Sequence, residues 1–494
     1  MACVIGIDIG TTSTVGILVR LPDQVLGLAA RPVTLSSPHP GWAEENPEDW
    51  WQNVCAVTRE LLASSAVHQD ELTGVGITGM LPAVVLLDKD GCPLRPSIQQ
   101  SDGRCTREVE ELRAEIDESA FIRIAGNGIN QQLIAGKLRW IERHEPEVFN
   151  RIATMFGSYD YINWRLTGER RIEQNWALEA GLVDLRHHRI TEELVAHTHL
   201  PASVFPPMAR STEIIGTVCR QAALESSLPV GLPVVGGAAD LVASALAAGL
   251  VNSGDALLKF GGSIDVLVAT DRIAPDRRMF LDYHLVPGLY LPNGCMATGG
   301  SGLNWFASTF AGGEKPQAEA AGLSLLQHLD RLAELVEAGA GGVAILPYFL
   351  GEKTPIHDAR ARGAITGLSL SHSIGHLWRA LLEAYAYAIA HHVEVFREMG
   401  HGVSNYTACD GGAASRIWMQ IVADVLDHPI QLLEGHPGSC LGAAWTAAVA
   451  VRLDDWSGIS RFVRKADLIR PNTRNTAVYA NGYRAFRETY RRLN

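Results

Sequence analysis

One local pattern occurs twice in this chain of 494 residues: an apolar strand, a turn of Gly and hydroxyl residues, and a second apolar strand. The first copy covers residues 3–19, and its first strand contains a carboxylate, Asp8. The second copy covers residues 256–268. The turns are Gly10, Thr11 and Thr12 in the first copy and Gly261, Gly262 and Ser263 in the second. Strands joined in this way predict β-hairpins, so we expect a duplicated α/β fold with a cleft between its halves.

The restart of this pattern also divides the chain. A length of 494 residues is too great for one ordinary hydrophobic core, so two or three domains are expected. We place an N-terminal domain at 1–247 and a C-terminal domain at 248–494. Other local signals predict strands at 73–78, 83–88 and 229–236, helical segments at 106–146, 374–398 and 415–427, and a helix that Asn46 caps.

Composition limits the class of protein. Hydrophobic residues make up 47% of the chain and the net charge is −12, which is typical of a soluble α/β protein and argues against a nucleic-acid-binding surface. The eight cysteines include no Cys-x-x-Cys pair, so we expect reduced thiols instead of a disulfide framework or a zinc site. No apolar run is long enough for a membrane span, and no basic segment precedes the first strand. We therefore expect a cytoplasmic protein that binds neither nucleic acid nor membrane.

The first turn has the chemistry of a phosphate loop. A polyphosphate needs clustered backbone N–H donors, small side chains that let it approach, and a carboxylate that holds its metal ion. The segment Asp8-Ile-Gly-Thr-Thr-Ser13 supplies all three. An ordinary hairpin turn with Asp8 exposed explains the same residues equally well. The turn at 261–263 is better explained, when taken alone, as a plain tight turn.

Two common nucleotide-binding motifs are absent. The sequence contains no G-x-x-x-x-G-K-[ST] loop. Residues 74–79 match G-x-G-x-x-G, but the apolar run that follows predicts a strand, whereas a dinucleotide-binding fingerprint needs a helix at that point.

Several other residues have both a structural and a functional explanation. Asp240 follows a buried strand, where it could cap a helix or act as a general base at the carboxyl end of the sheet. Asp102 and Arg104 could bind a polar ligand, although pairing with each other on a surface loop explains them as well. His391 and His392 lie in an apolar helix and are expected to pack or point outward instead of binding metal. The turn of Gly411, Gly412 and Ala413 could accept a flat ring or a phosphate, or could serve tight packing alone.

Together these pieces resemble the FGGY family of carbohydrate kinases, within the actin, hexokinase and Hsp70-like ATPase superfamily. The resemblance spans nearly the whole chain and keeps its order. Its elements are Gly6 to Thr12, Gly41 to Trp51, Asp160-Tyr161, Leu166 to Gly168, Gly236 to Asp240, Gly351 to Pro355, Ala361 to Gly363, Gly411 to Ser415, and Leu441 to Ala444. Single elements are weak matches, whereas the ordered series is specific. Its spacing resembles xylulokinases more than glycerol kinases.

The resemblance implies a fold of two actin-like (ribonuclease H-like) ATPase domains that flank a central cleft. It implies that Asp240 is the base that takes the proton from the sugar hydroxyl, and that Asp8 holds Mg²⁺. The two Gly-rich turns match the phosphate loops for ATP, and the turn at 411–413 matches the adenosine pocket. By position, the candidates for contact with the sugar are Trp42, Met80, Leu81 and Asp102.

The sequence departs from the family pattern on both sides of the expected site. Xylulokinases usually carry Gln-Met-His-Gly where Met80-Leu81-Pro82-Ala83 stands, and Trp-Asn-Asp where Gln100-Ser101-Asp102 stands. On the nucleotide side, Gly262 replaces a usual Thr, and Asp410 stands where Gly is common. The elements of phosphoryl transfer are thus retained, while the residues expected to contact the sugar are altered.

The resemblance implies an ATP-dependent kinase that phosphorylates a terminal hydroxyl of a small ketose or polyol, with xylulose or a related pentulose as a candidate. The alternative is a non-catalytic sugar or nucleotide sensor on a kinase fold, which the apolar segment at 80–83 favours and the retention of Asp8 and Asp240 disfavours. An ATP-driven conformational machine fits less well, because no peptide-binding or filament-forming segment is evident. A homodimer is typical of the family.

Overall fold

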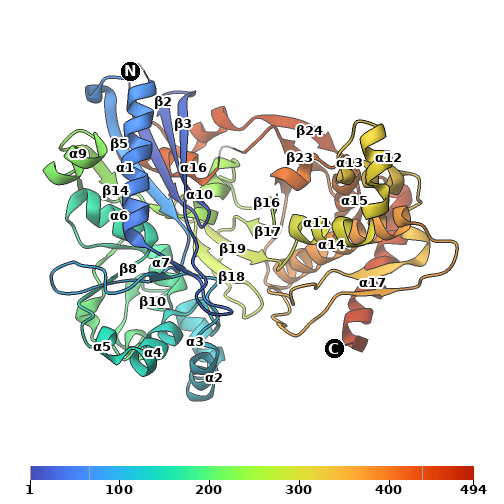
Figure 1. The fold of residues 1–494 in the computed structure, drawn as a ribbon, viewed down its shortest axis with the longest axis horizontal. Helices are drawn as coiled ribbons and strands as arrows, with labels where there is room; N and C mark the ends of the chain where they lie inside the picture. Colours follow the sequence, from blue (N-terminus) through green and yellow to red (C-terminus); the bar gives the residue numbers. More distant parts are fainter. Residues whose placement is uncertain (1, 66, 437, 494) are drawn as a thin grey trace. The chain divides into compact units, whose positions relative to one another are not determined.

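The computed structural model describes residues 2–65, 67–436 and 438–493, which form two compact units (Figure 1). The first unit contains Met1–Val251, Pro275–Leu291 and Pro437–Val463. The second unit contains Asn252–Ala274, Pro292–His436 and Arg464–Asn494. Two segments that lie beyond residue 250 in the sequence therefore complete the first unit.

The first unit is built on a mixed sheet with the strand order β13-β14-β5-β1-β2-β3. Strands β1 and β2 are antiparallel and form the predicted hairpin, whereas β1 and β5 are parallel. The strands of this sheet are β1 (Cys3–Ile9), β2 (Ser13–Arg20), β3 (Gln24–Pro32), β5 (Leu72–Gly79), β13 (Ile214–Thr217), β14 (Pro233–Val235) and β15 (Ala238–Ala239), the last of which pairs with β5. Residues 74–79, which match G-x-G-x-x-G, thus lie within a strand. This placement agrees with the rejection of a dinucleotide-binding fingerprint there.

Helices pack on both faces of this sheet. Helix α1 (Pro47–Ser64) packs on β2 and β3, and the Asn46 side chain accepts a hydrogen bond from the Glu48 N–H (3.1 Å), as the predicted cap requires. Helix α16 (Ser439–Ala450) packs on β1 and β5 and on helix α10 (Asp240–Ala247). A Cβ placed on Gly6 would lie 1.9 Å from the Cys440 carbonyl oxygen. This close approach requires glycine in the strand.

The rest of the first unit consists of further helices and short strands, of which α6 packs on β5 and α9 on α1. Its helices are α2 (Thr106–Glu115), α3 (Glu118–Ala125), α4 (Ile134–His144), α5 (Pro146–Phe149), α6 (Ser158–Thr167), α7 (Gln174–Glu179), α8 (Glu192–Ala196) and α9 (Arg220–Ser226). Its short strands are β4 (Glu44–Glu45), β6 (Val85–Leu87), β7 (Ser97–Ile98), β8 (Thr154–Phe156), β9 (Ile172–Glu173), β10 (Val183–Asp184), β11 (Arg189–Ile190), β12 (Met208–Ala209) and β18 (Phe280–Tyr283).

One strand is shorter than the sequence predicts. The prediction of a strand at 229–236 was wrong at both ends, since β14 covers only Pro233–Val235. The Leu232 N–H donates to the Pro229 carbonyl oxygen (3.2 Å) and Gly231 has a φ of +87°, so a turn replaces the first half of the predicted strand.

The second unit repeats the hairpin and sheet. Its sheet has the order β19-β17-β16-β22-β23-β24, with β16 antiparallel to β17 and parallel to β22. The strands of this sheet are β16 (Asp255–Phe260), β17 (Ile264–Val268), β19 (Tyr290–Cys295), β22 (Asn405–Cys409), β23 (Ile430–Leu433) and β24 (Lys465–Ile469), and a separate pair is β20 (Ala344–Leu346) and β21 (Ala364–Thr366). The helices are α11 (Gly300–Phe310), α12 (Lys315–Ala320), α13 (Leu325–Glu334), α14 (Ile374–Glu398), α15 (Arg416–Leu426) and α17 (Thr476–Leu493).

The buried histidines of α14 serve packing. His391 and His392 are 8% and 1% exposed, and the His392 ring bonds the Thr354 hydroxyl (2.9 Å) and the Ala388 carbonyl oxygen (2.8 Å). Burial lowers the pKa of His392 to about 4. In the described parts of the chain, no group of three or more His, Cys, Asp or Glu side chains could hold a metal ion, no cysteine forms a disulfide bond, and no helix is long and apolar enough to cross a membrane.

Candidate active site

Asp8 and the first Gly-rich turn lie together at the carboxyl end of β1. The turn is fixed at both ends, because the Gly10 N–H donates to the Ser13 carbonyl oxygen (3.1 Å) and the Val33 N–H donates to the Thr12 carbonyl oxygen (2.9 Å). Asp8 is half-buried, and its Oδ2 accepts a hydrogen bond from the Ser439 hydroxyl (2.6 Å). Since Ser439 is the first residue of α16, this contact orients the carboxylate from a segment 431 residues away.

The donor chemistry around Asp8 fits Mg²⁺. Magnesium prefers oxygen ligands and usually keeps several of its waters, so one or two carboxylates together with nucleotide phosphates suffice to hold it. Asp8 offers one carboxylate, and Thr11 and Thr12 place hydroxyl groups in the adjoining turn. A dedicated cage of protein ligands is not needed for such a site.

Asp240 is the first residue of α10, directly after the short strand β15. The turn that leads to it is held by side chains from two other elements. The Asn163 amide donates to the Gly236 carbonyl oxygen (2.9 Å), and the Thr78 hydroxyl donates to the Ala238 carbonyl oxygen (2.8 Å). Asp240 therefore occupies a fixed position at the carboxyl edge of the sheet, where open α/β sheets bind ligands.

The helix-cap explanation of Asp240 was wrong. Ala239 occupies the N-cap position and contributes no side-chain hydrogen bond. Asp240 lies one residue later, where its Oδ1 accepts from the Leu241 N–H (2.6 Å). A carboxylate in the first helical turn is favourable beside the positive end of the helix dipole.

A buried acid near Asp240 was missed in the sequence. Glu179, the last residue of α7, has a pKa well above the usual range, first because burial disfavours its charge and then because Asp282 and Asp240 lie nearby. Burial and these two nearby carboxylates therefore favour the protonated form of Glu179. No sequence pattern marks Glu179, because its neighbours come from distant segments.

Lys137 is a second buried group that the sequence did not reveal. Its side chain is inaccessible to solvent, and its ammonium donates to the carbonyl oxygens of Gln99 (2.8 Å) and Pro82 (3.4 Å). Burial lowers the pKa of Lys137 to about 8. Lys137 thus joins the segment at 80–83 to Gln99, which directly precedes the segment at 100–102, and both of these segments differ from the family pattern.

Replacing Lys137 should change how stability depends on pH. Because its pKa falls from 10.5 to about 8 on folding, the unfolded chain holds the proton between these values while the folded chain has released it. Wild-type stability relative to Lys137→Met should therefore rise by about 3 kcal/mol from pH 8 to pH 10.5. Urea unfolding at several pH values measures the difference. Lys89→Met, at an exposed position, is the control and should show no such rise.

Three of the four predicted sugar-side residues are buried, and Trp42 is half-buried. Met80 and Leu81 are 1% and 5% exposed, and the Met80 carbonyl oxygen accepts from the Ser158 hydroxyl (2.7 Å). Asp102 and Arg104 do pair (2.8 and 2.7 Å), but the prediction of a surface loop was wrong, because Asp102 and the Arg104 side chain have no solvent exposure. A loop distant in sequence covers them, with the Trp42 ring lying 3.8 Å from the Arg104 guanidinium carbon.

Asp102 is held by several donors. Burial alone would raise its pKa, but the Arg104 side chain and the backbone N–H groups of Ala43 (2.6 Å) and Arg104 (3.0 Å) lower it. Glu44 also pairs with Arg104 (2.7 Å). Through these contacts, Asp102 and Arg104 hold the loop at 41–44 in place.

In the second unit, the turn at 261–263 is fixed against the start of α11. The carbonyl oxygen of Gly261 accepts from the Gly300 N–H (2.9 Å), and that of Gly262 accepts from the Ser301 N–H (3.0 Å) and hydroxyl (2.7 Å). A Cβ placed on Gly262 would meet no atom within 4 Å, so the turn has open space in front of it.

The turn at 411–413 lies beside the turn at 261–263 within the same unit. Gly412 packs closely, since a Cβ placed there would lie 2.7 Å from the Trp418 ring and 2.8 Å from Phe260. Gly411, by contrast, has open space where its Cβ would be. The Asp410 Oδ2 atom would lie 3.8 Å from a Cβ on Gly261, so the two Gly-rich turns and one carboxylate meet in one place.

Comparison with known proteins identifies the chain. The description "FGGY family of carbohydrate kinases" matches with its N-terminal domain over residues 3–247 and with its C-terminal domain over residues 262–451. This chain belongs to the FGGY family of carbohydrate kinases. The xylulose kinase of Escherichia coli strain K12 is 30% identical over 493 residues, covering 99% of this chain and 98% of that protein.

Solved structures of FGGY kinases agree with this assignment. The crystal structure of xylulose kinase from Rhodospirillum rubrum is 55% identical, covers 99% of both chains and has a TM-score of 0.94. Plasmodium falciparum glycerol kinase with ADP shares the fold, with a TM-score of 0.87 at 20% identity, covering 99% of this chain and 98% of that one. The predicted actin-like ATPase fold is confirmed, and the chain is a sugar kinase of a family that uses ATP. The non-catalytic sensor is not favoured.

In this FGGY kinase, Asp410 has a strained backbone. Its φ of 71° and ψ of −177° fall in a region that glycine adopts freely and that costs other residues about 1–3 kcal/mol. We expect Asp410→Gly to raise the free energy of unfolding by about 1 kcal/mol. The variant should also lower the KM for ATP, because a negative charge beside the Gly261 turn is removed.

The measurements are urea unfolding and steady-state kinetics. Asp427→Gly is the matched control, since Asp427 also has a positive φ, of 49°, at the end of α15. It should stabilise the protein without changing the KM for ATP. An unchanged or higher KM in Asp410→Gly would show that the Asp410 carboxylate does not oppose phosphate binding.

Proposed function

We propose that this kinase transfers the γ-phosphoryl group of ATP to a terminal hydroxyl of a small ketose, with xylulose as the first candidate. The observation that carries the proposal is the 55% identity, over nearly the full length, to a protein described as a xylulose kinase. The positions of Asp8 and Asp240 at the carboxyl edge of one sheet support it.

Asp240 is the proposed general base. A carboxylate within hydrogen-bond reach of the sugar hydroxyl orients it and accepts its proton as the new O–P bond forms. The turn from Gly236 to Ala239 fixes this carboxylate, so little reorganisation is needed at the moment of reaction. Burial and the nearby carboxylates raise the pKa of Glu179, which favours its neutral form close to Asp240.

Asp8 is the proposed site for Mg²⁺, which when bound neutralises charge on the β- and γ-phosphates. The Ser439 hydroxyl holds the Asp8 carboxylate in one orientation. The backbone N–H groups of Thr11 and Thr12, and those of the turn at 261–263, are the proposed donors to phosphate oxygens, while Gly10 lets the phosphates approach. The turn at 411–413, with open space at Gly411, is the proposed contact for the adenosine ring.

A coupled assay of ADP release tests the proposal. The panel contains ketoses, alditols and sugar acids of three to seven carbons, each with Mg²⁺ and ATP. We expect D-xylulose to give the highest kcat/KM. A sugar acid or alditol with a higher kcat/KM would reject xylulose as the substrate, and ADP release that no member stimulates would reject the kinase reaction with these sugars.

A further inference from the structure

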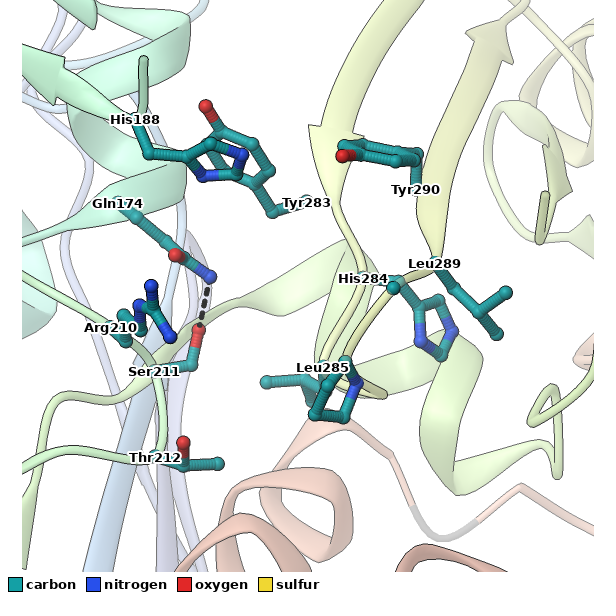
Figure 2. A pocket seen from close by; sticks show the side chains of 12 residues that line it. Gln174, His188, Arg210, Ser211, Thr212, Tyr283, His284, Leu285, Leu289 and Tyr290 are labelled. Carbon is teal, nitrogen blue, oxygen red and sulfur yellow. Dashed lines mark hydrogen bonds between the residues drawn. The ribbon is translucent and has the colours of Figure 1, made fainter. Parts of the chain in front are cut away.

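A pocket of about 270 Å³ lies in the first unit and includes no residue that the proposed reaction uses. Figure 2 shows side chains from four segments lining it: the start of α7, the turn at 188, the loop at 210–212 and the segment at 283–290. Six of its residues define its chemistry, namely Gln174, His188, Arg210, Ser211, Tyr283 and Tyr290. Its volume suits a small metabolite instead of a macromolecule.

One wall of the pocket is polar and already ordered. The Ser211 hydroxyl is buried, donates to the carboxylate of Glu173 (2.6 Å) and accepts from the Gln174 amide (3.3 Å), a contact drawn in Figure 2. Arg210 lies beside them and is exposed to solvent. A guanidinium next to fixed polar groups is suited to binding a carboxylate or a phosphate.

The opposite wall is aromatic. The His188 ring stacks on Tyr283 with the ring centres 4.7 Å apart, and Tyr290 lies 6.1 Å from Tyr283. Burial and the charge of Arg210 lower the pKa of His188, so Arg210 supplies the positive charge of the pocket at neutral pH. Flat aromatic surfaces opposite polar donors suit the carbon skeleton of a sugar derivative, which has apolar C–H faces and polar edges.

The pocket wall also supports the turn that positions Asp240. The Gly236 N–H donates to the Glu213 carbonyl oxygen (2.8 Å), and the Gly237 N–H donates to the Ser211 carbonyl oxygen (3.2 Å). A Cβ on Gly236 would lie 2.3 Å from the Arg210 carbonyl oxygen, so the loop and the turn are in direct contact. A shift of the loop at 210–213 therefore shifts the turn.

A second connection runs through buried side chains. The Tyr159 hydroxyl donates to Glu173 (2.9 Å), the same carboxylate that Ser211 contacts. The Tyr159 ring packs against the Gly237 backbone, since a Cβ placed there would lie 3.3 Å from it. Ser211 thus reaches the turn before Asp240 both through its own backbone and through Glu173 and Tyr159.

We propose that this pocket binds a small anionic polyol, either a sugar phosphate or a sugar acid, and that the bound anion changes kcat through the turn at 236–239. Arg210 binds the anionic group, Gln174 and Ser211 contact hydroxyl groups, and the aromatic wall contacts the carbon skeleton. Binding is independent of the proposed reaction, whereas the effect on kcat rests on it.

Calorimetric titration tests binding, with D-ribose 5-phosphate, D-gluconate and neutral ribitol as probes and with saturating D-xylulose present. We expect one of the two anions to bind and ribitol not to bind, and the anion that binds tells a phosphate site from a carboxylate site. Arg210→Gln should weaken binding at least about tenfold, since a charge-assisted hydrogen bond is lost. Arg220→Gln, at an exposed position on α9, is the matched control and should bind as wild type does.

Three results would overturn the proposed site: no binding by either anion, equal binding by ribitol, or unchanged binding in Arg210→Gln. Tyr290→Ala provides a second variant, which should also weaken binding by removing part of the aromatic wall. The kinetic arm measures kcat with and without the anion that binds. If Arg210-dependent binding leaves kcat unchanged, the connection to Asp240 is rejected. If no sugar is phosphorylated, the proposed function fails while the binding result stands.

Discussion

Asp240→Asn should reduce turnover by about 100- to 10,000-fold, since a positioned general base contributes about 10²–10⁴ to the rate. The amide keeps the size of the side chain and can still occupy the start of α10, but it cannot accept the hydroxyl proton. The affinity for nucleotide should stay close to that of wild type. Single-turnover kinetics with saturating sugar, together with titration of ATP, measure both effects.

Glu179→Gln is the matched control for this variant. Because burial raises the pKa of Glu179 and so favours its uncharged form, an amide of the same size should change kcat far less than Asp240→Asn does. Turnover retained in Asp240→Asn would reject Asp240 as the base. Equal losses in the two variants would show that the two carboxyl groups act as one unit, which contradicts separate roles for Asp240 and Glu179.

Asp8→Asn should lower kcat by about 100-fold or more at fixed Mg²⁺, because a fixed charge in the phosphate-binding turn is lost. The concentration of Mg²⁺ needed for half-maximal rate should rise. Asp8 is at the end of a strand whose backbone pairs on both sides, so the substitution should leave the sheet intact. The measurements are kcat as a function of Mg²⁺ and the midpoint of urea unfolding.

Ser439→Ala tests how much the orientation of the Asp8 carboxylate contributes, apart from its charge. This variant keeps the carboxylate but removes the 2.6 Å hydrogen bond that fixes it. We expect a smaller rise in the Mg²⁺ requirement than in Asp8→Asn and a kcat that excess Mg²⁺ largely restores. An unchanged Mg²⁺ dependence in Asp8→Asn would exclude Asp8 from the metal site.

The elements that local sequence specifies were predictable. The hairpin at β1 and β2 follows from two apolar runs around Gly10 to Thr12, and its repeat at β16 and β17 follows in the same way. Helix α14 begins and ends at the predicted residues, because its apolar pattern continues without interruption. In these cases the residues that decide the structure are neighbours in the chain.

The contacts that shape the candidate site were not predictable, because they join distant segments. The Asp102 carboxylate looked like one half of a surface pair, yet the Ala43 N–H, 59 residues away, binds it and the loop around Trp42 buries it. In the sequence, Lys137 is one charged residue of a helical segment, and nothing near it indicates burial. Only the fold brings the carbonyl groups of Pro82 and Gln99 to its ammonium group. The strained φ of Asp410 has no local sequence signal beyond an unusual residue at that position.

The packing of α16 on β1 has a consequence for how the protein is made. Strand β1 leaves the ribosome before the other strands of its sheet, but the helix that covers it and supplies Ser439 is synthesised more than 400 residues later. The surface around Gly6 therefore stays uncovered for almost the whole of translation, and the first unit cannot reach its final form as soon as its own strands are complete. A nascent chain stopped before residue 436 should remain a partner for chaperones, and its sensitivity to protease should end only when the last segment emerges.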